Sequence, residues 1–145
     1  MKRILLILTI FFGAFQMASA QDHINWTTNV KEAKAMAAKQ DLPIFAFFTG
    51  KDWCPPCKKL TKNTLETSDF ASYAKDNFIM LELDFPRGQR ENINPENMRL
   101  LQKFSVQGFP TVILMDADEN KLGQTGYRPF TPEEYIEHIT SILKS

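Results

Sequence analysis

Apolar runs of strand length alternate along the chain with polar segments that carry helix-capping signals. The run PIFAFFT at 43–49 is apolar at nearly every position, which predicts a central strand covered on both faces. Two further strands are predicted at 78–85 and 111–115, and a fourth at 121–127 pairs antiparallel with the third across a turn. Residues 25–27 would form a short first strand.

Helices are predicted between these strands, each opened by a residue whose side chain can cap the first turn. The predicted caps are Asn29, Ser68 or Asp69, Asn94 and Thr131, and the helices run over 30–39, 55–65, 68–74, 95–104 and 132–143. The last helix carries an apolar stripe made of Tyr135, Ile136, Ile139, Ile142 and Leu143. Alternating strands and helices predict an α/β fold, with a central mixed β-sheet flanked by helices on both faces.

The first twenty residues are expected to lie outside the fold. Two basic residues precede an apolar run at 4–15, and the small residues 18–20 follow, which is the pattern of a cleaved secretory signal peptide. The run is shorter than the roughly 20 apolar residues that span a bilayer, and a buried N-terminal helix is the alternative. We therefore predict a signal peptide at 1–20, one domain at 21–145, and a periplasmic or secreted bacterial protein.

The composition of the chain argues against several classes of protein. The chain has 145 residues, of which 43% are apolar, and this length suits a single domain whose core needs no disulfide or metal. Lys and Arg (17) balance Asp and Glu (17), so no basic excess points to nucleic acid. Two cysteines are too few for a disulfide-rich scaffold.

Cys54 and Cys57 carry the clearest chemical signal, because they are two residues apart where a strand gives way to a helix. In the first turn of a helix this spacing brings both sulfurs within bonding reach, so a disulfide can open and close with little backbone movement. The helix N-terminus favours the thiolate of Cys54, which would attack, and a more buried Cys57 would resolve the mixed disulfide. Pro55 and Pro56 stiffen the turn and would tune the redox potential.

Three other interpretations of the cysteine pair are weaker. A zinc site needs two more ligands, and His23 and His138 lie near opposite ends of the predicted domain, so we predict no metal site. A purely structural disulfide across so short a loop would stabilise the fold poorly. A chance pair of cysteines in a core is disfavoured by the adjacent Trp53 and the prolines.

Phe109 and Pro110 form a second candidate group, just before the strand at 111–115. A proline at a strand start donates no ladder bond, and a cis bond there would leave the backbone of Phe109 free to pair with an extended substrate. Taken alone, the local sequence favours an ordinary trans proline, because cis bonds are about 5–6% of X-Pro bonds.

Together the two motifs resemble the thioredoxin superfamily. Residues 53–58 (WCPPCK) match its W-C-x-x-C-K active site, and residues 106–111 (VQGFPT) match the V-x-G-x-P-T stretch that carries its cis-proline. The resemblance runs from Trp26 to the last helix, and it implies a thioredoxin-like fold with a cis bond before Pro110. Exported thioredoxin-like proteins are the most similar, among them the periplasmic C-terminal domain of the transmembrane thiol–disulfide interchange reductase. Features shared with that domain are DWC at 52–54, Lys58, NTL at 63–65, DF at 69–70 and GY at 126–127.

The resemblance implies an exported thiol–disulfide oxidoreductase that reduces extracytoplasmic protein disulfides or the apocytochromes of cytochrome c biogenesis. The catalytic residues would be Cys54 and Cys57, and the substrate would be contacted by Trp53, Pro55, Pro56, Phe109 and Pro110. The expected partners are protein thiols and disulfides and a membrane-embedded electron donor. We expect a monomer with no cofactor beyond the dithiol. The alternatives are a dithiol oxidant that introduces disulfides and a non-catalytic binding module.

The chain departs from the family pattern, and the usual proton acceptor is missing. Thioredoxins carry a buried acid on the strand before the motif, which helps deprotonate the second cysteine, and here that position is Phe47 or Phe48. Glu82 or Asp52 could replace the acid, although a solvated surface position is the favoured interpretation of both. The loop at 86–97 is longer than in a minimal thioredoxin, and we expect it to be solvated rather than bound to a partner.

Overall fold

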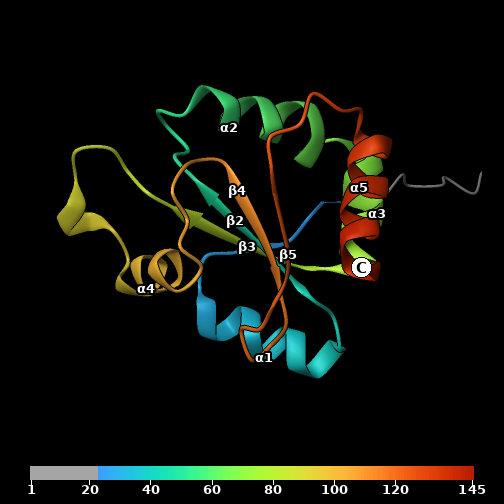
Figure 1. Cartoon of the computed structure of the whole chain (residues 1–145), viewed down its shortest axis with the longest axis horizontal. Helices are drawn as coiled ribbons and strands as arrows, with labels where there is room; N and C mark the ends of the chain where they lie inside the picture. Colours follow the sequence, from blue (N-terminus) through green and yellow to red (C-terminus); the bar gives the residue numbers. More distant parts are fainter. Residues whose placement is uncertain (1–22) are drawn as a thin grey trace, which may run out of the picture.

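The computed structural model describes residues 23–145, and the predicted signal peptide at 1–20 lies outside them. Within the described residues, five strands form one mixed sheet in the order β1-β3-β2-β4-β5 (Figure 1). The strands are β1 Trp26–Thr27, β2 Ile44–Thr49, β3 Ile79–Asp84, β4 Thr111–Met115 and β5 Lys121–Gly126. β3 is parallel to β1 and β2, whereas β4 is antiparallel to β2 and β5. The predicted mixed sheet and its antiparallel hairpin are confirmed.

Helices cover both faces of this sheet, as predicted. The α-helices are α1 Val30–Gln40, α2 Pro55–Leu60, α3 Ser68–Asn77, α4 Pro95–Lys103 and α5 Pro132–Lys144, joined by a π-helical turn, η1 Thr61–Leu65, and a 3-10 turn, η2 Arg90–Asn92. α1 and α4 pack on one face, and α2, α3 and α5 pack on the other (Figure 1). Over residues 23–145, no helix is both long enough and apolar enough to cross a membrane.

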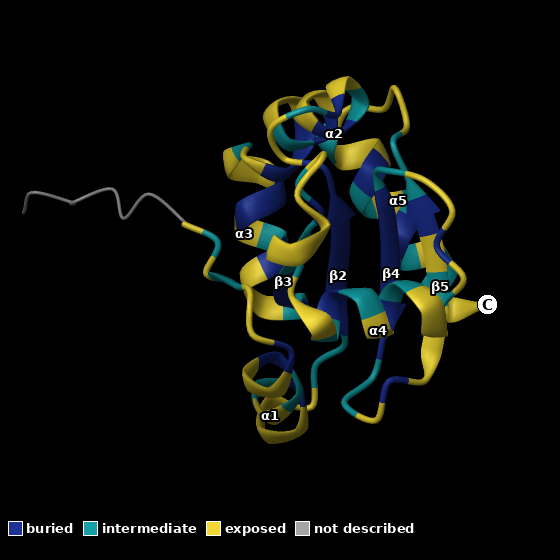
Figure 2. Cartoon of the chain, turned by 90° about the vertical axis from the view of Figure 1, so that its left-hand side faces the viewer, coloured by how far each residue is buried: buried dark blue, intermediate teal, exposed yellow. Residues whose placement is uncertain are grey.

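β2 and β4 form the buried centre of the sheet, drawn dark blue in Figure 2. Every residue of both strands is buried, as expected for apolar runs covered on two faces. Successive side chains of β2 enter different cores: Phe48 packs with α1 and α4, whereas Phe47 packs with α2, α3 and α5 alongside both cysteines. Of Phe47 and Phe48, Phe47 is therefore the residue on the cysteine side.

Local capping signals explain most of the helix starts. Side-chain oxygens accept a first-turn N–H at the predicted caps of α1, α4 and α5, which are Asn29, Asn94 and Thr131. The predicted cap of α3 is wrong. Thr67, rather than Ser68 or Asp69, has the extended backbone of a cap, and its hydroxyl accepts the N–H of Phe70 at 3.4 Å.

The segment after the cysteine motif differs from the continuous helix predicted to about Leu65. α2 ends at Leu60, and the next turn is π-helical, with the N–H of Glu66 donating to the carbonyl of Thr61 at 2.9 Å. A π-helical turn brings residues five apart onto the same side. Leu60 and Leu65, which are five apart, are consequently both buried in the core that contains the cysteines.

Candidate active site

Cys54 and Cys57 form a disulfide at the start of α2, with their Cα atoms 5.3 Å apart. Cys54 is the N-cap, and the N–H of Cys57 donates to the Cys54 Sγ at 3.3 Å. Both residues are buried, Cys54 being 3% exposed and Cys57 1%. The predicted proximity of the sulfurs is confirmed. The N–H of Cys57 also lies where it would stabilise a thiolate on Cys54 once the disulfide opens.

The turn between β2 and α2 holds the cysteine motif against the sheet. The carbonyl of Gly50 accepts the N–H groups of Trp53, at 3.1 Å, and Cys54, at 2.8 Å. The N–H of Lys51 donates to the carboxylate of Asp84, at the end of β3, at 2.9 Å. These bonds fix the backbone just before the disulfide, so the opened thiols would stay in place.

Pro55 and Pro56 occupy the first two positions of α2. N–H groups at these positions have no partner within a helix, so the two prolines remove no helical hydrogen bond. Pro55 is exposed and Pro56 is half-buried. Both rings therefore remain accessible next to Cys54, where a partner could contact them.

Trp53, which precedes Cys54 in the chain, forms an aromatic rim together with Phe85 and Phe109. Trp53 Nε1 donates to the carbonyl of Phe85 at 2.8 Å, and the Trp53 ring meets Phe109 edge-on, with centroids 5.9 Å apart. Phe85 and Phe109 stack at 5.0 Å, and the Arg87 guanidinium lies 5.4 Å from the Trp53 ring. Phe85 and Arg87 were not predicted as site residues, because no local signal places the end of β3 beside Trp53.

Phe109 and Pro110 lie directly before β4, and the peptide bond between them is cis, as the resemblance implies. Both residues are half-buried. The hydroxyl of Thr111 donates to the carbonyl of Gly108 at 2.7 Å. On the other side, a Cβ at Gly126 would lie 2.9 Å from the Pro110 oxygen, so the end of β5 approaches this segment closely. Phe109 is thus in contact with Trp53, and the end of β5 packs against Pro110.

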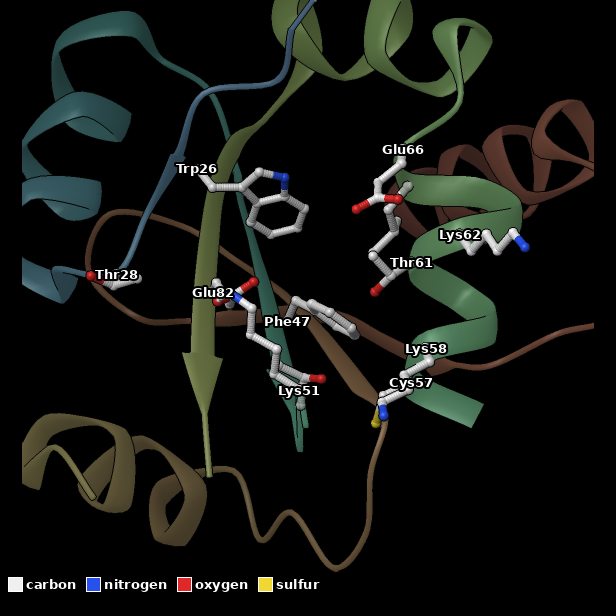
Figure 3. Close-up of a pocket in the computed structure, with 12 residues that line it drawn as sticks. Trp26, Thr28, Phe47, Lys51, Cys57, Lys58, Thr61, Lys62, Glu66 and Glu82 are labelled. Atoms are coloured by element: carbon white, nitrogen blue, oxygen red, sulfur yellow. Dashed lines mark hydrogen bonds and ion pairs between the residues drawn. The ribbon is translucent and has the colours of Figure 1, made fainter. Parts of the chain in front are cut away.

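A cavity of about 750 Å³ opens between α2–η1 and the sheet and reaches Cys57 (Figure 3). Residues from β1, β2 and β3 line its opposite wall. Its lining includes Trp26, Phe47, Lys51, Cys57, Leu65 and Glu82. None of the rim residues, nor Cys54, lines this cavity. Of the two cysteines, Cys57 therefore borders this cavity and Cys54 does not.

Glu82 is part of the wall of this cavity. The register of β2 and β3 places it beside Phe47, and its carboxylate accepts a hydrogen bond from Lys51 Nζ at 3.3 Å. Its side chain is 22% exposed. Strand pairing turns Glu82 toward the helices, so it is half-buried, and its ion pair with Lys51 remains in contact with solvent. Asp52 is exposed and does not line the cavity.

This arrangement is suited to thiol–disulfide chemistry. The opened disulfide would present one sulfur at a helix cap and a second on Cys57, a residue that borders the cavity. Across residues 23–145, no three His, Cys, Asp or Glu side chains are grouped as metal ligands would be.

Sequence relatives carry the same type of domain. Residues 30–140 match the model of the thioredoxin-like domain. The disulfide bond reductase DsbH of Chlamydia pneumoniae is 36% identical over 110 residues, which cover 74% of this chain and 66% of that protein. The thiol:disulfide interchange protein DsbD of Vibrio vulnificus is 32% identical over 120 residues, which cover 79% of this chain and 19% of that protein. The chain thus spans just under two thirds of the first relative and about a fifth of the second.

Solved structures agree with the sequence relatives. A structure of DsbH oxidoreductase superposes with a TM-score of 0.75 at 31% identity, over 84% of this chain and 85% of that chain. The oxidised C-terminal domain of DsbD from Neisseria meningitidis shares the fold, with a TM-score of 0.57 at 20% identity, over 76% of this chain and 89% of that domain. The sheet order, the helix positions and the matched domain model lead to one assignment: the chain belongs to the thioredoxin-like domain family.

Proposed function

We propose that the protein is an exported thiol–disulfide oxidoreductase that uses Cys54 and Cys57 to reduce disulfides of extracytoplasmic proteins. The observation that carries the proposal is the Cys54–Cys57 disulfide at the start of α2, next to the aromatic rim. The name of the Chlamydia pneumoniae relative, a disulfide bond reductase, supports the reducing direction. The signal-peptide pattern at 1–20 supports export.

In this reaction the reduced protein supplies two electrons. The Cys54 thiolate attacks one sulfur of a partner disulfide, forming a mixed disulfide and releasing the other partner sulfur as a thiolate that takes up a proton. The Cys57 thiolate then attacks Cys54 Sγ, which releases the second partner sulfur and forms the Cys54–Cys57 bond. A second dithiol protein, which we propose to be a membrane-embedded donor, reduces that bond and restores the starting state.

The rim and the segment before β4 would form the docking surface for the partner. Trp53 and Phe109 meet edge to face and are half-buried, so each keeps some apolar surface for contact. Pro110 and the two prolines of α2 flank the same end of the sheet. Their accessible rings would contact the partner chain around its cysteine.

A redox titration of the Cys54–Cys57 pair against glutathione or dithiothreitol tests the proposed direction. We expect a potential near about −270 mV, the range of thioredoxin, because such a dithiol reduces partner disulfides. A potential near about −120 mV would instead identify a dithiol oxidant that introduces disulfides. A pair with no reversible transition would leave only a binding module.

Trapping experiments test the roles of the two sulfurs. The Cys57→Ser variant lacks the resolving thiol, so it should accumulate mixed disulfides with its partners, visible as dithiothreitol-sensitive bands on non-reducing gels. Cys54→Ser lacks the attacking sulfur and should show no turnover and no trapped partner. Trapping by Cys54→Ser but not by Cys57→Ser would reverse the assignment of the two cysteines.

A further inference from the structure

We propose that Glu82 accepts the proton of Cys57 through the cavity beside α2 when Cys57 resolves the mixed disulfide. This inference rests on the proposed function, because it specifies how the second of the two exchange steps is made possible.

Cys57 needs a route by which its proton can leave. The residue is 1% exposed and lies among apolar side chains, where a thiolate is harder to form than in water. A thiol attacks a disulfide only as the thiolate, so the proton must go to a base before or during the attack. The cavity reaches Cys57 and is open enough to hold water, which makes it the path to such a base.

Glu82 is the carboxylate best placed along this path. Two carboxylates line the cavity, those of Glu82 and Glu66. Glu82 belongs to the sheet and sits beside Phe47 on the cysteine side, whereas Glu66 follows η1 and is exposed. Figure 3 shows Glu82 and Lys51 on one side of the Phe47 ring and Cys57 on the other. A water chain around this ring would connect the carboxylate with the sulfur.

Lys51 positions the carboxylate. Its Nζ lies 3.3 Å from the Glu82 carboxylate, and its own backbone N–H is bound to Asp84, so the lysine is held at both ends. The lysine side chain is 64% exposed, which leaves the ion pair in contact with solvent. We therefore treat Lys51 as a positioning residue and Glu82 as the group that exchanges the proton.

Atoms and electrons balance in the proposed step. The Cys57 thiol gives its proton through water to the Glu82 carboxylate, and the resulting thiolate attacks Cys54 Sγ. The bond between Cys54 and the partner sulfur breaks, the Cys54–Cys57 bond forms, and the partner leaves as a thiolate. The protein dithiol has then lost two electrons to the partner disulfide. In the reverse direction Cys57 leaves as a thiolate and takes the proton back from Glu82.

A two-step reaction with the aromatic disulfide 5,5′-dithiobis(2-nitrobenzoate) separates this step from the first. Attack by Cys54 releases one coloured thiolate, and resolution by Cys57 releases the second. We expect Glu82→Gln to leave the first release unchanged and to slow the second about tenfold to a hundredfold near neutral pH, because a general base is lost. The second release is measured in stopped-flow absorbance from about pH 4 to pH 10, the range over which carboxylates and thiols ionise.

The pH profile distinguishes proton transfer from a merely structural effect. In the parent protein the rate of the second release should reach a plateau as the pH rises, because a carboxylate serves as the base. In Glu82→Gln it should keep rising with pH, and the two rates should converge where Cys57 ionises without help. Glu82→Asp should restore part of the plateau, and Glu66→Gln, which removes the other cavity carboxylate, should behave like the parent.

Three other results would contradict the role of Glu82, and a fourth would contradict the exchange function. An unchanged second release in Glu82→Gln, or an equal loss in Glu66→Gln, would overturn the assignment of Glu82. So would a first release slowed as much as the second, since that would indicate a damaged Cys54. If the parent protein releases no second thiolate at all, the proposed exchange function fails rather than this inference.

Discussion

Trp53 connects the disulfide to the rest of the molecule through one side chain. Its indole N–H is bound to Phe85, and its ring packs over Gly50, the residue whose carbonyl receives the N–H groups of Trp53 and Cys54. A Cβ at position 50 would lie 2.6 Å from Trp53 Cζ2, closer than real side chains approach. The glycine is therefore required for the close packing of the indole.

We expect Gly50→Ala to displace Trp53 and to weaken the exchange reaction. The added methyl group should cost about 1–3 kcal/mol of unfolding free energy, as overpacking generally does, and should shift the tryptophan emission by breaking the bond to Phe85. Chemical denaturation measures the change in unfolding free energy, and fluorescence spectra measure the shift in tryptophan emission. The matched control is Gly108→Ala, because a Cβ at Gly108 meets no atom within 4 Å. Equal emission spectra for Gly50→Ala and the parent would contradict this account.

At the scale of elements, one buried carboxylate joins two helices to a strand hairpin. Glu119, in the turn between β4 and β5, is 5% exposed and forms salt bridges with Lys34 of α1 at 2.9 Å, Arg99 of α4 at 2.7 Å and Lys103 at 2.9 Å. The hydrogen bond from Arg99, with further bonds from Lys103 and Lys34, holds the pKa of Glu119 well below its usual range although burial opposes this. The Glu119 carboxylate thereby holds α1 and α4 against the hairpin of β4 and β5.

Protonation of Glu119 should therefore destabilise the fold in acid. Its pKa is lower in the folded chain than the ordinary value of 4.5, so its contribution is complete above about pH 4.5 and is lost as the pH falls. Glu119→Gln should lose about 1–3 kcal/mol of unfolding free energy at neutral pH and show a weaker acid dependence than the parent. Urea titrations between about pH 3 and pH 7 measure this difference. Glu137→Gln, at an exposed carboxylate, is the control and should match the parent.

The elements that could be predicted are those whose signals are local. Asn29, Asn94 and Thr131 start helices because their side chains bond to N–H groups a few residues away. The cap of α3 was misplaced because Thr67 stands next to Ser68 and Asp69, which are equally capable caps. The π-helical turn was missed because apolar residues five apart carry no recognised periodic signal.

At the scale of the whole molecule, the site combines segments that are distant in sequence. The cysteine motif and the Phe109–Pro110 segment could be connected beforehand, because both belong to a known pair of family motifs. The position of Phe85 beside Trp53, and of Glu82 beside Phe47, depends on the strand order and register. Long-range pairing decides these, and no local pattern encodes it.

The predicted export depends on residues 1–20, and it has a direct test. Produced with residues 1–145 in a bacterium with two membranes, the protein should be recovered from the periplasmic extract with the mass of residues 21–145. The Ala20→Arg variant places a large charged side chain at the predicted cleavage site and should retain the first twenty residues. A full-length protein confined to the cytosolic fraction would contradict the predicted signal peptide.

The rim and the cavity share no residue, although they serve sulfurs only three positions apart. The residues proposed to contact the partner, Trp53 and Phe109, are therefore distinct from those that line the cavity beside Cys57. In the proposed reaction, electrons would be exchanged at the rim, whereas the proton of Cys57 would leave through the cavity. A folded partner docked on the rim would then remain in place while Cys57 loses its proton, and it would leave when Cys57 resolves the mixed disulfide.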